Sequence, residues 1–148
     1  MAWVDELRGQ LVALDTAPLI YFIEEHPEYC PVVAPFFEQL DKGLLRAATS
    51  VITLSEVLVK PLRDGDARLA EQYREILLNA EGLTTVDVSA AIAEKAARLR
   101  SQYSLRTPDA IQIATALHTG ASALLTNDIR WPALPDLRIL TLDSLLQG

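Results

Sequence analysis

The 148-residue sequence has little of several features that define large classes of proteins. It has one cysteine, Cys30, so no disulfide can form within the chain, and a reducing, cytosolic compartment is expected. Its apolar runs, of which 121–125 is one, are far shorter than the ~20 residues that cross a bilayer. The acidic start of the chain does not resemble a secretion signal. We therefore expect a cytoplasmic protein that makes no association with a membrane.

Basic residues are also scarce. The sequence has 13 Lys and Arg against 20 Asp and Glu, which gives a net charge of -7. Binding to nucleic acid through a broad basic surface depends on many Lys and Arg contacts with phosphates, so this balance excludes that mode of binding. An acidic surplus is compatible with a site for a divalent cation or with a cationic partner, and equally with simple solubility.

No Ser-, Gly- or Pro-rich stretch and no internal repeat interrupts the chain, and 50% of its residues are hydrophobic. A chain of this length buries roughly 70% of its unfolded surface, which is enough for a core without a disulfide or a structural metal. We expect one compact domain over residues 1–148.

Short apolar runs alternate along the chain with stretches of helical spacing. The predicted strands are 11–14, 44–49, 83–88, 123–125 and 138–142, and the predicted helices are 16–25, 32–42, 53–60, 67–79, 90–103 and 108–119. This alternation predicts an α/β domain with a mainly parallel sheet, because parallel strands need crossover connections that cover both faces. The runs 11–14 and 123–125 are apolar at consecutive positions, as expected of central strands.

Acidic residues follow the predicted strands. Asp15 comes directly after 11–14, and Asp128 comes shortly after 123–125. Glu56 lies in the first turn of the helix after the second strand, and Asp109 begins the helix at 108–119. The carboxyl ends of parallel strands meet at one edge of the sheet, where ligands bind near the point at which the strand order reverses. The sequence therefore predicts one pocket that contains four carboxylates.

Each acid also has a structural explanation. Asp15 could be the N-cap of the helix that follows it, and Thr53 with Glu56 has the spacing of a capping box. Asp109 lies where the dipole of its helix favours negative charge, and Asp128 could be an ordinary turn residue. If these roles were the whole account, the acids would have no reason to come together.

Carboxylates packed in one pocket repel and raise one another's pKa values, a cost that a bound divalent cation removes. Neither His26 nor His118 lies in a cluster that resembles a set of metal ligands. Hard oxygen ligands without histidine or cysteine favour Mg²⁺ or Mn²⁺ over zinc.

Four motifs, taken in order, resemble the acidic motifs of PIN-domain nucleases. They are Leu-Asp-Thr at 14–16, Thr-Leu-Ser-Glu at 53–56, Thr-Pro-Asp-Ala at 107–110 leading into Ile-Ala-Thr-Ala at 113–116, and Leu-Thr-Asn-Asp at 125–128. Any one motif is weak, whereas four in this order over nearly the whole chain are a strong signal. The size of the chain is most similar to that of the VapC-like toxin ribonucleases of VapBC toxin–antitoxin pairs.

The resemblance implies a three-layer α/β/α sandwich with a parallel sheet of about five strands, Mg²⁺- or Mn²⁺-dependent cleavage of RNA, a homodimer, and inhibition by a small antitoxin protein. By position, Asp15, Glu56 and Asp109 match the three usual acids and Asp128 matches a frequent fourth. Thr126 matches a hydroxyl residue near the metal. We expect Asp15 and Asp109 to be direct ligands, with the other two acids holding water or completing the shell of a second ion.

Basic residues near the acidic motifs are candidates for contacts with RNA phosphates. They are Lys60, Arg106 and Arg130. The alternative is that they are surface charges or form salt bridges with the acids. Trp131 is close enough to Asp128 in sequence to meet RNA, although a packing role is the simpler interpretation.

Two predicted helices carry more apolar residues than one buried face needs. They are Val32, Val33, Phe36, Phe37 and Leu40 from one helix, and Tyr73, Ile76 and Leu77 from a later one. These residues either belong to the core or line a groove for an antitoxin helix or a dimer contact.

Other functions remain open at this point. The main alternative is a non-catalytic interaction module whose acidic pocket binds a basic partner segment. A phosphatase with an aspartyl nucleophile is disfavoured, because such sites usually carry a second Asp two residues after the first and this chain has Ala17 there. A receiver-like signalling domain is disfavoured because no lysine follows a late strand in the expected way.

Overall fold

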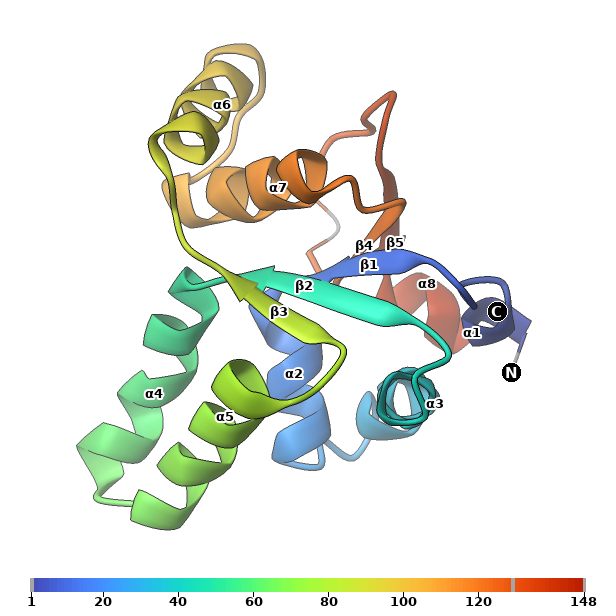
Figure 1. The fold of residues 1–148 in the computed structure, drawn as a ribbon, viewed down its shortest axis with the longest axis vertical. Helices are drawn as coiled ribbons and strands as arrows, with labels where there is room; N and C mark the ends of the chain where they lie inside the picture. The colour runs from blue at the N-terminus through green and yellow to red at the C-terminus, as the bar shows by residue number, and fades with distance from the viewer. Residues whose placement is uncertain (1, 129, 148) are drawn as a thin grey trace.

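The computed structural model describes residues 2–128 and 130–147. Its strands are β1 (Leu11–Leu14), β2 (Arg46–Ser50), β3 (Leu83–Val86), β4 (Ala123–Thr126) and β5 (Arg138–Thr141). They form a parallel five-stranded sheet in the order β3-β2-β1-β4-β5 (Figure 1). The predicted parallel sheet is confirmed, and β1 and β4 both lie inside it, as the apolar character of their sequences predicts.

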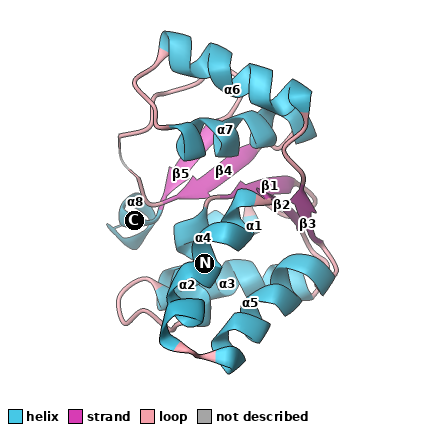
Figure 2. Ribbon diagram, turned by 90° about the vertical axis from the view of Figure 1, so that its left-hand side faces the viewer, coloured by secondary structure: helices cyan, strands magenta, loops and turns pink. Residues whose placement is uncertain are grey.

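Helices cover both faces of the sheet, so the molecule has three layers (Figure 2). One face carries α6 (Ala90–Gln102) and α7 (Thr107–Thr119). The other carries α1 (Ala2–Asp5), α2 (Thr16–Ile23), α3 (Cys30–Asp41), α4 (Ile52–Asp64), α5 (Ala67–Asn79) and α8 (Leu142–Gln147). In the part of the chain that the structure describes, no helix is long and apolar enough to span a membrane.

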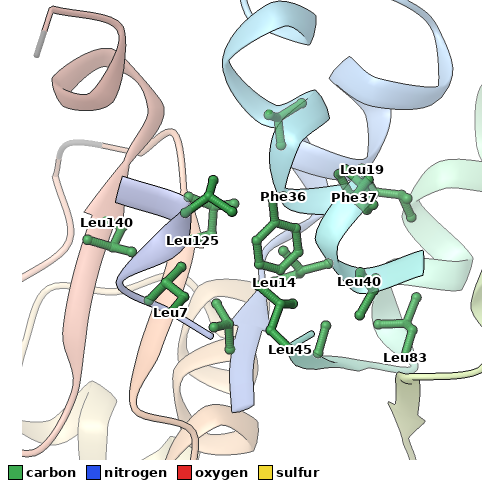
Figure 3. Packing of buried hydrophobic residues seen from close by; sticks show 14 of the residues in the cluster. Leu7, Leu14, Leu19, Phe36, Phe37, Leu40, Leu45, Leu83, Leu125 and Leu140 are labelled. Atoms are coloured by element: carbon green, nitrogen blue, oxygen red, sulfur yellow. The ribbon is translucent and has the colours of Figure 1, made fainter. Parts of the chain in front are cut away.

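Alternate side chains of β1 enter two different hydrophobic clusters. Val12 and Leu14 belong to the larger cluster, under α2 to α5, whereas Ala13 packs with α6 and α7. This alternation is the expected consequence of a strand whose successive side chains point to opposite faces. Figure 3 shows the larger cluster, in which Leu14 lies close to Phe36 and Leu45. The core therefore fixes β1 from both sides.

Small residues let α7 approach the sheet closely. Ala110 and Ala114 are fully buried against Ala13 of β1 in the smaller cluster. Pro108 stands in the first turn of α7, where its missing N–H costs no hydrogen bond, and Gly120 ends the helix with φ 77°, a conformation that glycine adopts without strain. As a result, the N-terminus of α7 lies over the carboxyl edge of the sheet.

Some predicted boundaries are wrong by a few residues. The helix expected to end at Lys60 continues through Pro61 to Asp64, and Gly65, at φ 70°, ends it. The second strand begins pairing at Arg46, two residues later than predicted, and the preceding Leu45 is buried in the core. The short helices α1 and α8 were not predicted, and Leu142, expected in the last strand, begins α8. These differences leave the order of the predicted elements intact.

Several apolar residues proposed for an external groove are core residues instead. Val33, Phe36 and Tyr73 are 0% exposed and Leu77 is 1% exposed. The groove interpretation is therefore wrong for these four, because they fill the layer between α3, α5 and the sheet. Phe37 and Ile76 do border an external groove, which is described below.

The buried position of Phe36 can be tested by truncation. Phe36→Ala should lower the free energy of unfolding by about 3–5 kcal/mol, because it leaves a cavity in the larger cluster. Leu146, which is 41% exposed on α8, provides the control, and Leu146→Ala should change stability by no more than about 0.5 kcal/mol. Guanidinium denaturation measures both. Similar losses for the two variants would contradict this core.

Candidate active site

The four predicted acids lie on segments that meet at the carboxyl edge of the sheet. The chain leaves β1 toward β2 on one side and has β4 on its other side, so the strand order reverses at β1. Asp15 directly follows β1 and Asp128 follows β4. Asp109 is in the first turn of α7, and Glu56 is in the second turn of α4 rather than its first, because that helix begins at Ile52. Open parallel sheets bind ligands at this place.

Asp15 is bonded to β4 through both its backbone and its side chain. Its backbone N–H donates to the carbonyl oxygen of Leu125 at 2.9 Å, and its carboxylate Oδ2 accepts a hydrogen bond from the Thr126 hydroxyl at 2.8 Å. Asp15 occupies the N-cap position of α2 but makes no side-chain capping bond to that helix. Asp15 is therefore the N-cap residue of α2 by position, as predicted, whereas its carboxylate is bonded to Thr126 of β4.

The environment of Asp15 disfavours its charge. Burial is the largest cause and raises the pKa of Asp15 from 3.8 to about 6, and the charges of Asp109 and Glu56 push in the same direction. The hydrogen bond from Thr126 opposes this rise because it stabilises the carboxylate. Three of the four predicted acids are thus electrostatically coupled.

Glu56 is held by a residue of the neighbouring helix. Its Oε1 accepts a hydrogen bond from the Thr16 hydroxyl at 2.5 Å. Thr53 and Glu56 do not form the predicted capping box, because the N-cap residue of α4 is Val51, which makes no side-chain capping bond. The Thr53 hydroxyl lies 3.3 Å from that of Thr16 and points into the interior network described next. Glu56 is therefore oriented toward α2 and the residues around Asp15.

A buried polar network lies beneath the acids. The Thr49 hydroxyl donates to the Leu14 carbonyl at 2.8 Å, so the Thr53 hydroxyl, 2.8 Å away, is the donor to Thr49. Gln112 donates to Thr53 at 2.7 Å and accepts from the backbone N–H of Ser50 at 3.3 Å. This network ties β1, β2, α4 and α7 together directly below the pocket.

Sequence reasoning missed Thr49 and Gln112 as parts of the site. Both are buried, at 2% exposure. The signal was present for Gln112, a polar residue between Ile111 and Ile113 in a helix with apolar neighbours, and one turn after Asp109. A buried amide needs hydrogen-bond partners, so its position pointed to other buried polar groups.

Asp109 lies near the surface end of the pocket. Its side chain is 13% exposed and its Oδ2 accepts a hydrogen bond from Arg106 Nε at 3.2 Å. The positive end of the α7 dipole favours its charge, as the structural explanation predicted. That role leaves its second oxygen, Oδ1, with no hydrogen bond from the described residues.

Asp128 is held by Arg130. Its Oδ1 accepts from both the backbone N–H and Nε of Arg130, and its Oδ2 accepts from Nη2 at 2.8 Å. These bonds hold the pKa of Asp128 below its usual value. The turn role is confirmed, but the same residue also reaches the site, because its backbone N–H donates to the Thr126 hydroxyl at 3.1 Å. Thr126 therefore joins Asp15 to Asp128.

Asp109 and Asp128 share a cavity of about 450 Å³. Its other lining residues are Arg100, Ser104, Leu105, Arg106, Arg130 and Trp131. Of the three predicted phosphate contacts, Arg106 and Arg130 are thus beside the acids. Lys60 is not, since it pairs at 3.2 Å with Glu24, which follows the opposite end of α2 from Asp15.

The chemistry of the acids fits a hard dication. No three Asp, Glu, His or Cys residues in the described part of the chain lie close enough to form a complete protein cage for a metal ion. Mg²⁺ does not need one, because it keeps several waters and is usually held by one or two carboxylates. Asp15, whose pKa is raised by burial, and Asp109, with an open Oδ1, would supply that number of ligands. The prediction of one pocket that contains all four carboxylates is therefore wrong for the described residues, since Asp109 and Asp128 line the cavity whereas Asp15 and Glu56 do not.

Comparisons with known proteins agree with this geometry. Residues 12–137 match the PIN domain family. No curated protein matches the chain. A similar solved structure is VapBC2 from Rickettsia felis bound to a DNA fragment from its promoter, with a TM-score of 0.69 and 23% identity over 88% of this chain and 98% of that chain.

Two further structures are similar. One is a toxin–antitoxin complex from Klebsiella pneumoniae, with a TM-score of 0.63 and 25% identity over 85% of this chain and 94% of that chain. The other is VapC20 from Mycobacterium tuberculosis, a sarcin–ricin loop cleaving toxin, with a TM-score of 0.64 and 16% identity over 76% of this chain and 86% of that chain. The predicted resemblance is confirmed: the fold is VapC-like, and the chain belongs to the PIN domain family.

Proposed function

We propose that the chain is a Mg²⁺- or Mn²⁺-dependent endoribonuclease that hydrolyses RNA phosphodiester bonds and is the toxin of a toxin–antitoxin pair. The observation that carries the proposal is the carboxylate of Asp15, which is buried at the switch point, bonded to Thr126 and coupled to Asp109 and Glu56. Membership of the PIN family and the likeness to a sarcin–ricin loop cleaving toxin support it.

In this proposal Asp15 and Asp109 hold the ion. When bound, the dication supplies a more acidic water and a positive charge beside the phosphoryl oxygen. The chain's own residues fix the geometry. Thr126 orients the carboxylate of Asp15, and Thr16 orients that of Glu56. Glu56 is exposed and oriented toward the site, so it positions the water that attacks the phosphate.

A groove on the opposite side of the molecule supports an antitoxin partner. It has a volume of about 840 Å³ and lies between α2, α3 and α5. Phe22, Phe37 and Ile76 line it with apolar surface, and its acidic lining residues are Glu38, Asp41, Glu71, Glu75 and Glu81, with Arg68 as the basic one. An amphipathic helix with basic flanks matches both features, so we propose such a segment of a small antitoxin as its occupant.

A homodimer is also part of the proposal. Val59 and Leu62 on α4 and Leu78 on α5 are 49%, 60% and 55% exposed. Large apolar side chains exposed on neighbouring helices are typical of contact surfaces. We propose that α4 and α5 contribute to the dimer contact.

Cleavage of single-stranded RNA with Mn²⁺ tests the nuclease proposal. The wild-type protein should cleave, and EDTA should stop cleavage. Asp15→Asn and Asp109→Asn should each lower the rate by at least about 100-fold, because each removes a ligand charge while keeping the size of the side chain. Asp87→Asn, which changes an acid at the end of β3, is the control and should keep full activity. A folded wild-type protein that binds Mn²⁺ but leaves RNA intact would favour the non-catalytic interaction module.

The raised pKa of Asp15 predicts how stability depends on pH without metal. The folded pKa of about 6 exceeds the value of 3.8 expected when unfolded, so the folded state holds its proton more tightly. The stabilising contribution of the protonated Asp15 carboxyl group is fully present below the pKa of the unfolded state and is lost as pH rises through about 6. Between about pH 4 and about pH 8 this loss amounts to about 3 kcal/mol.

Asp15→Asn has no such titration and its amide oxygen still accepts from Thr126. In EDTA its free energy of unfolding should therefore exceed that of the wild type by up to about 3 kcal/mol at about pH 8, with the excess shrinking toward about pH 4. Urea denaturation at several pH values measures the difference. A loss of stability that is equal at every pH would indicate a purely structural role for Asp15.

Charge reversal tests the groove. Glu71→Lys with Glu75→Lys should weaken binding of the small protein encoded by the neighbouring reading frame by roughly tenfold or more, measured by calorimetry. Glu94→Lys is the matched control, because Glu94, like Glu71, is an exposed helix glutamate paired with an arginine of its own helix, but on the other face of the molecule. Equal weakening by both changes would argue against the groove.

A further inference from the structure

Two arginines form ion pairs with the carboxylates on the open side of the site. Arg106 Nε donates to Asp109 Oδ2 at 3.2 Å. Arg130 grips both oxygens of Asp128, with Nε 3.0 Å from Oδ1 and Nη2 2.8 Å from Oδ2. Positive charge therefore already stands at Asp109, which the proposed function assigns to a dication, and at Asp128, which lines the same cavity.

The two partners of each pair differ in freedom. The side chains of Asp109 and Asp128 are only 13% and 18% exposed, whereas those of Arg106 and Arg130 are 70% and 72% exposed. The carboxylates are fixed by a helix terminus and a turn, while the arginines extend into solvent on long side chains. Exposed ion pairs contribute little free energy, so the arginines can exchange this partner for another.

A second set of partners lies beside them. The cavity that contains both acids is also lined by Arg100, whose Nε donates to the Leu105 carbonyl at 3.0 Å, and by Ser104. Three guanidinium groups around one cavity suit phosphate oxygens, which they bind with paired hydrogen bonds. The chain as a whole has a net charge of -7, which repels RNA. Attraction of RNA therefore depends on local positive charge, which this group of arginines provides.

We propose that Arg106 and Arg130 are internal counter-ions that the dication displaces, and that the released arginines then bind phosphates of the RNA in this cavity. The proposal rests on the proposed nuclease function. In the metal-free protein the arginines neutralise Asp109 and Asp128 and so limit their repulsion of Asp15 and of RNA. The positive charge of a metal bound at Asp109 competes with both arginines for the neighbouring carboxylates, weakens these pairs and leaves two guanidinium groups for the substrate.

The exchange makes metal binding and RNA binding cooperative. Releasing the arginines costs part of the metal's binding free energy, and RNA that captures them lowers that cost. By linkage, the metal must then raise the affinity for RNA by the same factor by which RNA raises the affinity for the metal. A protein whose arginines act only as static surface charges lacks this reciprocal effect.

Metal affinity is the first readout and needs no catalysis. Calorimetry with Mn²⁺ and no RNA should give roughly threefold to tenfold tighter binding for Arg106→Gln/Arg130→Gln than for the wild type, because two competing ion pairs are gone. Arg130→Lys keeps the charge but loses the two-pronged grip, so it should tighten binding by a smaller factor. Arg98→Gln, which breaks an exposed pair with Glu94 on α6, is the control and should not change Mn²⁺ affinity.

RNA affinity is the second readout. Fluorescence anisotropy with a single-stranded RNA in Ca²⁺, which takes the same oxygen ligands, should show tight binding by the wild type and weaker binding by the double Gln variant. In Ca²⁺ the slope of log affinity against log salt should be smaller for the variant by roughly 1.4, which corresponds to two lost phosphate contacts at roughly 0.7 each.

The outcomes separate this inference from the proposed function. Unchanged Mn²⁺ affinity in the double Gln variant, or a value for Arg130→Lys equal to the wild type while the Gln variant tightens, would overturn displacement and leave the nuclease proposal standing. The same holds if the variant keeps the wild-type salt slope for RNA. Absence of Mn²⁺ binding by the folded wild-type protein would overturn both.

Discussion

The hydrogen bond between the Thr126 hydroxyl and the Asp15 carboxylate joins the ends of two strands that are distant in sequence, and the rest of the site depends on it. It forms because β1 and β4 are parallel neighbours in register, with Leu14 beside Leu125. The residues that follow this pair, Asp15 and Thr126, therefore lie side by side at the carboxyl edge of the sheet, at the point where the strand order reverses. The core fixes this register from both faces, so the position of one carboxylate follows from the packing of the whole sheet.

The charged form of that carboxylate also lowers the stability of the folded state. Burial and two neighbouring acids raise the pKa of Asp15, whereas an apolar or amide side chain in its place would avoid this cost. The side chains of Thr49, Thr53 and Gln112 below it are buried and linked by hydrogen bonds, so this unfavourable carboxylate lies on a well-ordered support. A destabilised charged group on a rigid support is the usual sign of a site kept for function rather than for folding.

The layer architecture followed from the sequence because alternating apolar runs and helical spacing have few compact solutions, and β1 and β4 were recognisable as buried strands from their consecutive apolar residues. The acids were recognisable because each follows a strand or begins a helix. What the sequence did not predict depends on distances between elements: that Thr16 bonds Glu56, and that Gln112 of α7 reaches Thr53 of α4. The choice between core and groove stayed open for Phe36 for the same reason, since the sequence does not reveal which apolar face a second layer covers.

We propose that Asp15 and Asp109, which β1 and α7 bring to the same edge of the sheet, hold a hard dication. The most direct measurement is a crystal structure of the protein grown with Mn²⁺, with anomalous diffraction recorded at the manganese edge. We expect an anomalous peak bonded to carboxylate oxygens of both Asp15 and Asp109. A protein saturated with Mn²⁺ that shows no peak at this edge of the sheet, with Asp15 still bonded only to Thr126, would contradict the account.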